Sequence, residues 1–129
     1  WLLGIQDAGQ LSIHAMRGAL FENWVITELL KQRFNRALVS NLYFWRDNTG
    51  NEIDVLLDEA GSLRPIEIKS GQTMRREYLA GLKKWCDLAE REEASTGQAT
   101  LVYGGDEVQQ RSDVDIVPWR DISSLHAHQ

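Results

Sequence analysis

Two stretches of alternating polar and apolar residues, joined by a short turn sequence, constrain the fold of this chain most strongly. The stretches are residues 51–58 and 63–69. Alternation of this kind indicates β-strands, and residues 59–62 between them have the composition of a tight turn. A two-residue or a four-residue loop gives the same hairpin register, in which the numbers of paired residues sum to 121.

This register predicts that Asp54 lies directly opposite Glu67, with Lys69 two residues further on the same face. Two facing carboxylates repel each other, so a sequence keeps such a pair most readily when a cation lies between them. Mg²⁺ or Mn²⁺ in such a place is held by one or two carboxylates, keeps several waters and takes phosphate oxygens as further ligands. We therefore predict metal-assisted phosphodiester hydrolysis, with Asp54 and Glu67 as metal ligands and Lys69 holding the attacking water or the phosphate.

The same register allows a second interpretation, in which this face is only a solvated polar surface. Glu52 and Lys69 also sum to 121 and would form a cross-strand ion pair. An exposed pair of this kind contributes about 0–1 kcal/mol to stability. The spacing of these residues alone leaves both interpretations open.

The remaining helices and strands are predicted from the spacing of apolar residues and from the turn residues that interrupt it. An α/β fold with the order α-β-β-β-α-β-β and a central mixed sheet flanked by helices is expected, because the second helix would serve as the crossover to a parallel strand. Pro118 suggests an edge strand. Tyr43, Phe44 and Trp45 are expected in the core, and the alternative is that they are platforms on which bases stack. The expected elements are a helix over about 17–36, a strand over 41–46, a turn over 47–51, a helix over about 74–93, and strands over 99–103 and 115–119.

Composition fits one globular domain, which we place at residues 17–122, after a tail of a preceding region (1–16) and before a frayed C-terminus (123–129). No apolar run approaches the length of a membrane span, so no membrane partner is expected. The single Cys86 makes a reducing cytoplasm the default location. The net charge of −5 argues mildly against a non-specific nucleic-acid binder but leaves a nuclease possible, because acids at a metal site lower the net charge.

Several other residues are candidates for the same chemistry. Glu22, near the start of the first helix, is either a partner of the helix dipole or a group aimed at the sheet, where it would be an outer-shell or second metal ligand. Five polar residues after the second hairpin strand can meet phosphates, or can simply form a solvated loop and helix face. They are Gln72, Arg75, Arg76, Lys83 and Lys84.

The pattern Asp54-x12-Glu67-Ile-Lys69, preceded by a helix that carries Glu22, resembles the PD-(D/E)xK nuclease superfamily with its restriction-endonuclease-like fold. More closely, the chain is similar to the C-terminal domain of unknown function found behind an AAA+ ATPase module in many prokaryotic proteins. The similarity runs from about residue 10 to 122 and is carried by residues 17–25, 43–47, 50–54, 66–71 and 101–105. The proline that precedes the aspartate in the superfamily is replaced here by Ile53.

The resemblance implies that Asp54 and Glu67 correspond to the metal ligands, Lys69 to the catalytic lysine and Glu22 to the helix acid. It implies a Mg²⁺-dependent or Mn²⁺-dependent endonuclease or exonuclease acting on DNA, in the C-terminal part of a larger ATPase-like protein, with a homodimer as one option for its assembly. The alternative is a catalytically silent module of the same fold that tethers an ATPase to DNA or to a protein partner. The sequence does not specify strandedness, sequence preference or oligomeric state.

Overall fold

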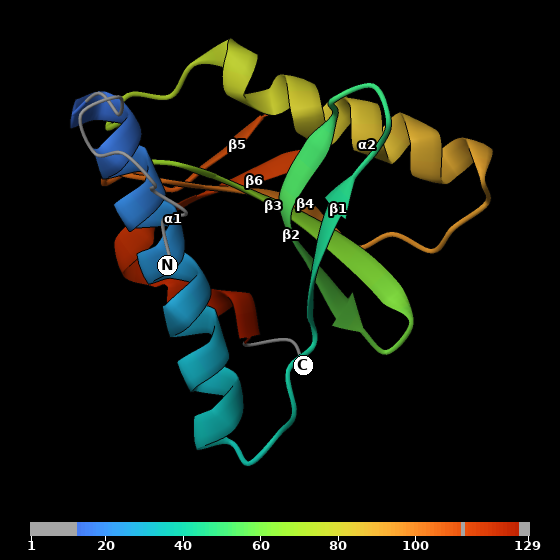
Figure 1. Cartoon of the computed structure of the whole chain (residues 1–129), viewed down its shortest axis with the longest axis horizontal. Coiled ribbons are helices and arrows are strands. Elements are labelled where there is room, and N and C mark those ends of the chain that lie inside the picture. Colours follow the sequence, from blue (N-terminus) through green and yellow to red (C-terminus); the bar gives the residue numbers. More distant parts are fainter. Residues whose placement is uncertain (1–12, 112, 127–129) are drawn as a thin grey trace.

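The computed structural model describes residues 13–111 and 113–126, and in this part of the chain a mixed α/β fold is built on a six-stranded sheet (Figure 1). Helices pack on both faces of the sheet, which is open rather than closed into a barrel. The elements are α1 (Ile13–Asn35), β1 (Leu42–Arg46), β2 (Glu52–Glu59), β3 (Ser62–Lys69), the 3-10 helix η2 (Arg76–Leu79), α2 (Ala80–Arg91), β4 (Ala99–Tyr103), β5 (Gln109–Arg111), β6 (Val114–Pro118) and the 3-10 helix η3 (Trp119–His126).

The strands lie in the order β1-β2-β3-β4-β6-β5. β1, β2 and β3 are antiparallel neighbours, β3 pairs with β4 and β4 with β6 in parallel, and β5 is antiparallel to β6. The chain passes from β3 to β4 through α2, which confirms the predicted parallel crossover. The predicted mixed sheet flanked by helices is likewise confirmed.

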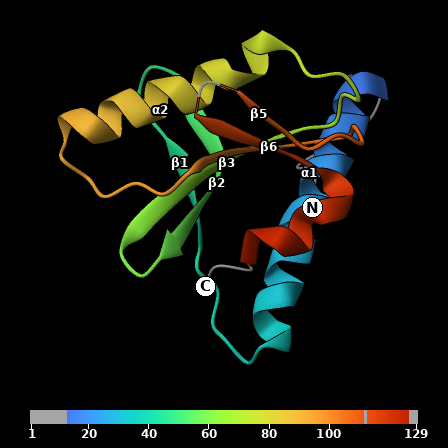
Figure 2. The ribbon, with the colours of Figure 1, turned by 180° about the vertical axis from the view of Figure 1, so that it is seen from behind.

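Two hydrophobic cores fill the two faces of the sheet. α1 and η3 cover one face, and Figure 2 shows them side by side, while α2 lies across the other face. Central strands contribute apolar side chains to both cores in alternation, as strands buried on both faces must. The core on the α1 face contains Val25, Leu29, Val55, Leu57, Ile66, Ile68, Val102, Val117, Ile122 and Leu125. The core on the α2 face contains Ile53, Leu56, Leu82, Trp85, Ala89, Ala99, Leu101, Tyr103, Val114 and Ile116.

The β2–β3 hairpin has the predicted register. Its pairs run from Glu59 with Ser62 to Val55 with Ile66, and in each pair the numbers sum to 121. A two-residue turn closes the hairpin. Ala60 and the next residue have φ angles of 57° and 90°, which is the left-handed backbone that tight hairpin turns require. This closed end of the hairpin is therefore a regular ladder.

The C-terminal half departs from the predictions in three ways. β6 lies inside the sheet rather than at its edge, because Pro118 is its last residue and the short β5, which was not predicted, pairs with its first three. The chain from Ser123 was expected to be frayed, yet η3 continues to His126 and the side chain of Leu125 is 1% exposed. The second helix begins later than predicted, since Arg76–Leu79 form a 3-10 turn before α2. Residues 127–129 and 1–12 lie outside the described part.

The aromatic residues of β1 are also placed differently from the prediction. β1 is an edge strand, and Tyr43 and Phe44 are 54% and 71% exposed, whereas Trp45 packs against the core on the α2 face. The expectation that all three belong to the core is therefore wrong for two of them. An edge strand has a neighbour on one side only, so fewer elements are available to cover its side chains.

Among the described helices, none is both long enough and apolar enough to cross a membrane.

Candidate metal and catalytic site

A β-bulge in β2 shapes the candidate site. The register between β1 and β2 shifts by one residue between Tyr43 and Trp45. As a result, Phe44 on β1 faces two residues of β2, Asp54 and Val55. A bulge bends its strand and re-aims a side chain, and here the re-aimed residue is the predicted metal ligand.

The bulge also ends the regular hairpin. Ile53 packs into the core on the α2 face, but Val55 packs into the core on the α1 face, so the alternation of side chains is interrupted between them. The β2–β3 ladder stops at the pair of Val55 with Ile66. Beyond this pair the two strands separate, and their backbone groups need other partners.

Two carboxylates supply those partners across the open end of the hairpin. The backbone N–H of Asp54 donates to Oε1 of Glu67 at 3.2 Å, and the backbone N–H of Ile68 donates to Oδ2 of Asp54 at 2.8 Å. Each acid therefore binds the strand that carries the other acid. This reciprocal arrangement fixes both side chains and uses one oxygen of each, so these two hydrogen bonds do not engage Oδ1 of Asp54 or Oε2 of Glu67.

The side chains of Asp54 and Glu67 approach each other from different sides of the sheet. The prediction that they face each other as a ladder pair on one side is therefore wrong. Ile66 and Ile68 point toward α1, so Glu67 between them is directed toward α2. Its carboxylate lies beneath the start of α2, where a Cβ built on Gly81 would be 3.8 Å from Oε2. Asp54 instead lines a cavity together with a residue of α1. The acids therefore meet at the gap between the strands, not as a ladder pair on one face.

Lys69 lies close to Glu67, on the same side of β3. Its Nζ is 3.8 Å from Oε2 of Glu67 and 6.0 Å from the ring centre of Tyr78. Glu52, the alternative partner that the hairpin register allows for this lysine, forms its ion pair with Arg46 instead, at 3.1 Å. The cross-strand pair expected for a merely solvated face is absent from the ion pairs of the described residues, because the ladder ends before that position.

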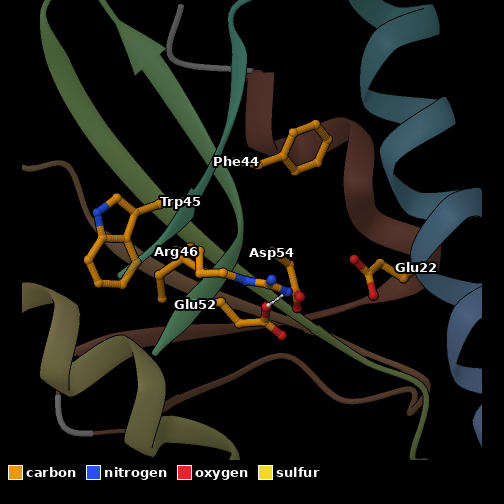
Figure 3. Close-up of a pocket in the computed structure, with 7 residues that line it drawn as sticks. Glu22, Phe44, Trp45, Arg46, Glu52 and Asp54 are labelled. Carbon is orange, nitrogen blue, oxygen red and sulfur yellow. Dashed lines mark hydrogen bonds and ion pairs between the residues drawn. The ribbon is translucent and has the colours of Figure 1, made fainter. Parts of the chain in front are cut away.

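Glu22 faces Asp54 across a cavity of about 360 Å³ at the open end of the hairpin. Figure 3 shows the carboxylates of Glu22 and Asp54 on opposite sides of this space, with Phe44 at its border. Glu22 comes from α1, and it is half-buried. The cavity is lined by Glu22, Phe44, Trp45, Arg46, Glu52, Ile53 and Asp54.

The electrostatics of this region indicate an excess of buried negative charge. Burial, and secondarily the charge of Asp54, raise the pKa of Glu67 from 4.5 to about 7. Burial and the charges of Asp54 and Glu52 raise the pKa of Glu22 from 4.5 to about 7 as well. Burial raises the pKa of Asp54, against the hydrogen bond from Ile68. Lys69 opposes all three shifts but does not cancel them, so the site favours protons or another cation.

A metal ion would find two close protein ligands here, not three. Within residues 13–111 and 113–126, no three His, Cys, Asp or Glu side chains come close enough together to hold one ion. Mg²⁺ usually needs only one or two carboxylates, since waters and substrate phosphate complete its shell. The pair of Asp54 and Glu67 fits that requirement, whereas Glu22 stands across the cavity.

The loop after β3 holds the lysine end of the strand in place. The N–H of Gly104 donates to the carbonyl of Gly71 at 3.0 Å. A Cβ at Gly104 would collide with the backbone carbonyl of Ser70, and one at Gly105 would collide with the ring of Tyr103. These glycines therefore allow the end of β4 to approach the chain that follows Lys69 closely.

The structure does not bring the predicted phosphate-contacting residues to the cavity. Arg75 forms an exposed ion pair with Glu77 at 3.7 Å, as the plainer interpretation of this helix predicted. Lys84 lines a different cavity, which also contains Asp87. Gln72, Arg76 and Lys83 are exposed on the loop after β3, on η2 and on α2.

Sequence analysis missed two residues that lie at the cavity, Phe44 and Arg46. One signal was present in the sequence: three successive apolar residues, 55–57, interrupt the alternation of β2. Such a run indicates a strand that is buried on both faces, and it marks the place where the regular pattern changes. Nothing in the sequence indicated which residue of β1 would face the bulge.

Comparison with known proteins gives a family but no activity. No curated protein matches the chain. Residues 17–122 match the family described as "Domain of unknown function (DUF4143)". This match spans most of the 129 residues and includes every residue of the candidate site. The chain therefore belongs to the DUF4143 family of domains of unknown function.

Proposed function

We propose that this domain is a metal-dependent nuclease that hydrolyses phosphodiester bonds in DNA, as the C-terminal part of a larger ATPase-like protein. The observation that carries the proposal is the reciprocal hydrogen bonding of Asp54 and Glu67, with Lys69 3.8 Å from Glu67. The arrangement fixes two acids and one ammonium group around the gap between two strands. Metal-assisted attack on a phosphodiester requires this combination of charges.

Asp54 and Glu67 would hold one Mg²⁺ or Mn²⁺ ion through Oδ1 and Oε2, the oxygens not engaged by the backbone. When bound, the ion would lower the pKa of a water and neutralise charge on the phosphate. It would also offset the burial and, to a lesser degree, the neighbouring negative charges that raise the pKa of both acids. A resident cation thus explains why the fold keeps these buried carboxylates together.

The remaining residues act on the water and the phosphate. Lys69 is 40% exposed and can reach a phosphate oxygen while staying near Glu67. A positive charge there stabilises the negative charge that develops on the phosphate during attack. Glu22, across the cavity, can hold a water and accept its proton, because a pKa near 7 suits a base at neutral pH.

The resemblance to the PD-(D/E)xK superfamily supports the same assignment. Its pattern places the two acids and the lysine on adjacent strands behind a helix acid, and β2, β3 and α1 carry these residues here. The similarity to domains found behind AAA+ ATPase modules supports the upstream ATPase. Fold alone does not establish activity, so the proposal depends on the side chains named above.

Calorimetric titration with Mg²⁺ and Mn²⁺ tests the metal site. The wild type should bind metal, and the variant with Asp54→Ala and Glu67→Ala should not. Glu90→Ala, which removes an exposed acid from α2, is the matched control and should bind like the wild type. Equal metal binding by the wild type and the double variant would show that the site does not exist.

Plasmid nicking tests the chemistry. Lys69→Ala should retain metal binding but lose about 10²–10³-fold in cleavage rate, the usual cost of removing one group that stabilises a transition state. If the wild type nicks no DNA with either metal while metal still binds, the catalytic half of the proposal is wrong.

One observation favours the second candidate function, a catalytically silent module. In the described residues no group of three metal-binding side chains is close enough to hold an ion, and each acid already accepts a backbone hydrogen bond. Asp54 and Glu67 would then serve only to tie β2 to β3. Under this alternative the domain tethers an ATPase to DNA or to a protein partner, and neither wild type nor Lys69→Ala nicks DNA.

A further inference from the structure

Phe44 is the most exposed aromatic side chain of the sheet that is described, and it stands at the candidate site. It is 71% exposed on β1, faces Asp54 and Val55 across the bulge, and lines the cavity with Glu22. Its neighbour Leu42, two residues earlier, packs against the core on the α1 face. Phe44 is therefore on the α1 face too, and Figure 3 shows it at the border of the cavity that Glu22 of α1 also lines.

The cavity beside Phe44 is large enough for part or all of one nucleotide. Its volume is about 360 Å³. Small-ligand sites run from roughly 300 to 1,000 Å³, so this cavity is near the lower end of that range. Its border combines one flat aromatic surface with the carboxylates of Glu22 and Asp54.

The charges at the cavity select which part of a nucleotide can enter it. Arg46 also lines the cavity, but it is paired with Glu52 at 3.1 Å, so the carboxylates of Glu22 and Asp54 leave the lining with an excess of acids. These acids repel a phosphate, but they do not repel the uncharged face of a base. A phosphate is attracted instead to the ammonium group of Lys69, which is 3.8 Å from Glu67 and is not part of the cavity lining. Stacking on an aromatic side chain is the way in which proteins hold bases that are not paired.

We propose that the strand to be cut is unpaired at the site and that Phe44 stacks on one of its bases, so that single-stranded DNA or a frayed end is the preferred substrate. This inference rests on the proposed nuclease function. Phe44 is a specificity-determining residue in it, since it binds a base while Asp54, Glu67 and Lys69 meet the phosphate. Isolated exposed apolar residues are common on protein surfaces, but this one lies across the bulge from a candidate metal ligand.

The experiment measures binding of single-stranded oligonucleotides with and without an internal 2-aminopurine, and of a blunt duplex of the same length. Ca²⁺ replaces Mg²⁺ so that binding is measured without cleavage. Stacking on Phe44 should quench the fluorescence of 2-aminopurine. Phe44→Ala should remove the quenching and raise the Kd for the single strand by about 5- to 150-fold, the usual effect of losing one stacked base.

Two further substitutions separate aromatic stacking from general apolar contact. Phe44→Trp should keep the quenching and the affinity, whereas Phe44→Leu, which is similar in size but has no ring, should behave like Phe44→Ala. Val108→Ala is the matched control, because Val108 is also 71% exposed and does not line this cavity. Val108→Ala should bind the single-stranded oligonucleotides and the blunt duplex like the wild type.

The inference is overturned if Phe44→Ala binds the single strand as tightly as the wild type, or if Phe44→Leu retains full affinity. It is also overturned if the wild type prefers the blunt duplex. If sedimentation shows that Phe44→Ala dissociates a wild-type dimer while single-strand binding is unchanged, the ring is a contact between two copies of the chain instead.

The two proposals fail in different ways. If single-strand binding depends on Phe44 but no metal binds and nothing is cut, the nuclease proposal falls and base stacking stands as a property of a silent module. If metal binds at Asp54 and DNA is cut while Phe44→Ala is without effect, only the stacking inference falls. Absence of any DNA binding by the wild type overturns both.

Discussion

The two ends of the β2–β3 hairpin differ in what holds them together. At the closed end, backbone pairs continue without interruption from Val55 to the turn, and apolar side chains are buried on both faces. At the open end, two buried carboxylates replace the missing backbone pairs, and their charges are only partly opposed by Lys69. The closed end is stabilised by the chain itself, whereas the open end holds carboxylates whose pKa values are raised by burial.

This difference explains how one hairpin can serve both fold and site. A regular ladder specifies its own register, so the closed end fixes where the open end begins. The bulge at Asp54 and Val55 then separates the strands at a defined residue. Functional sites commonly carry local instability that the rest of the fold tolerates, and the open end has that character.

The largest expected effect is the loss of stability when a buried leucine at the closed end is truncated. Leu57 is 0% exposed, and Leu57→Ala should lower the free energy of unfolding by about 3–5 kcal/mol, because both transfer and cavity terms are lost. Urea denaturation followed by circular dichroism measures this change. Val108→Ala, at an exposed position, should change stability by less than about 0.5 kcal/mol. A small effect of Leu57→Ala would mean that the closed end does not carry the stability assigned to it.

The next prediction concerns the pH dependence of the open end without metal. The pKa of Glu67 is about 7 in the folded chain, above its ordinary 4.5. Between these values the folded state binds more protons than the unfolded state, so the free energy of unfolding falls as pH rises from 4.5 to 7. For Glu67 the decrease is on the order of 1–3 kcal/mol, and Glu22 adds to it in the same window.

Urea midpoints in EDTA at pH 5 and pH 8 measure this dependence. Glu67→Gln should be less sensitive to pH and, at pH 8, at least as stable as the wild type, since glutamine keeps the acceptor for the N–H of Asp54. Asp47 acts in the opposite sense, because hydrogen bonds from Asn51 and Thr49 lower its pKa, so its contribution is lost only below pH 4. Wild-type stability that rises from pH 5 to pH 8 would contradict the buried charge assigned to Glu67.

The third prediction is that a bound cation stabilises the open end of the hairpin. At pH 8, Mg²⁺ at 100 times its Kd should raise the stability of the wild type by about 2.7 kcal/mol and leave the Asp54→Ala, Glu67→Ala variant unchanged. At pH 5.5 the gain should shrink, because protons then compete for the same carboxylates. Thermal melts across a Mg²⁺ series measure both effects. An equal gain in the double variant would place the metal elsewhere on the chain.

The sequence predicted the closed end almost completely and the open end only in part. Alternation and turn chemistry act within a few residues, and they gave the register from Glu59 to Val55. The bulge depends on how β1 meets β2, which is a contact between strands that alternation within β2 does not encode. For that reason Asp54 and Glu67 were identified correctly as neighbours, but their approach from different directions was not predicted.

The same distinction between local and tertiary information explains the other differences. Pro118 disfavours a central strand locally, yet it is the last residue of β6, where β5 no longer needs a donor. Phe44 has the residue type of a core position, but an edge strand leaves it uncovered. The raised pKa of Glu22 comes first from burial and then from the charges of Asp54 and Glu52 on β2, so no pattern within α1 indicates it.

The smallest expected effect comes from substitutions in the turn that closes the β2–β3 hairpin. Ala60 has a φ of 57°, a conformation that costs an alanine more than it costs an asparagine. Ala60→Asn creates the Asn-Gly pair that tight hairpin turns favour, and it should raise the free energy of unfolding by about 0.5–1 kcal/mol. Gly61→Ala, at a φ of 90°, should lower it by at least as much. Urea midpoints measure both changes.

Metal affinity at the open end should be the same in both variants, because the regular ladder between the turn and Val55 separates the two ends. A change in metal affinity that follows the turn substitutions would show that the two ends of the hairpin are coupled.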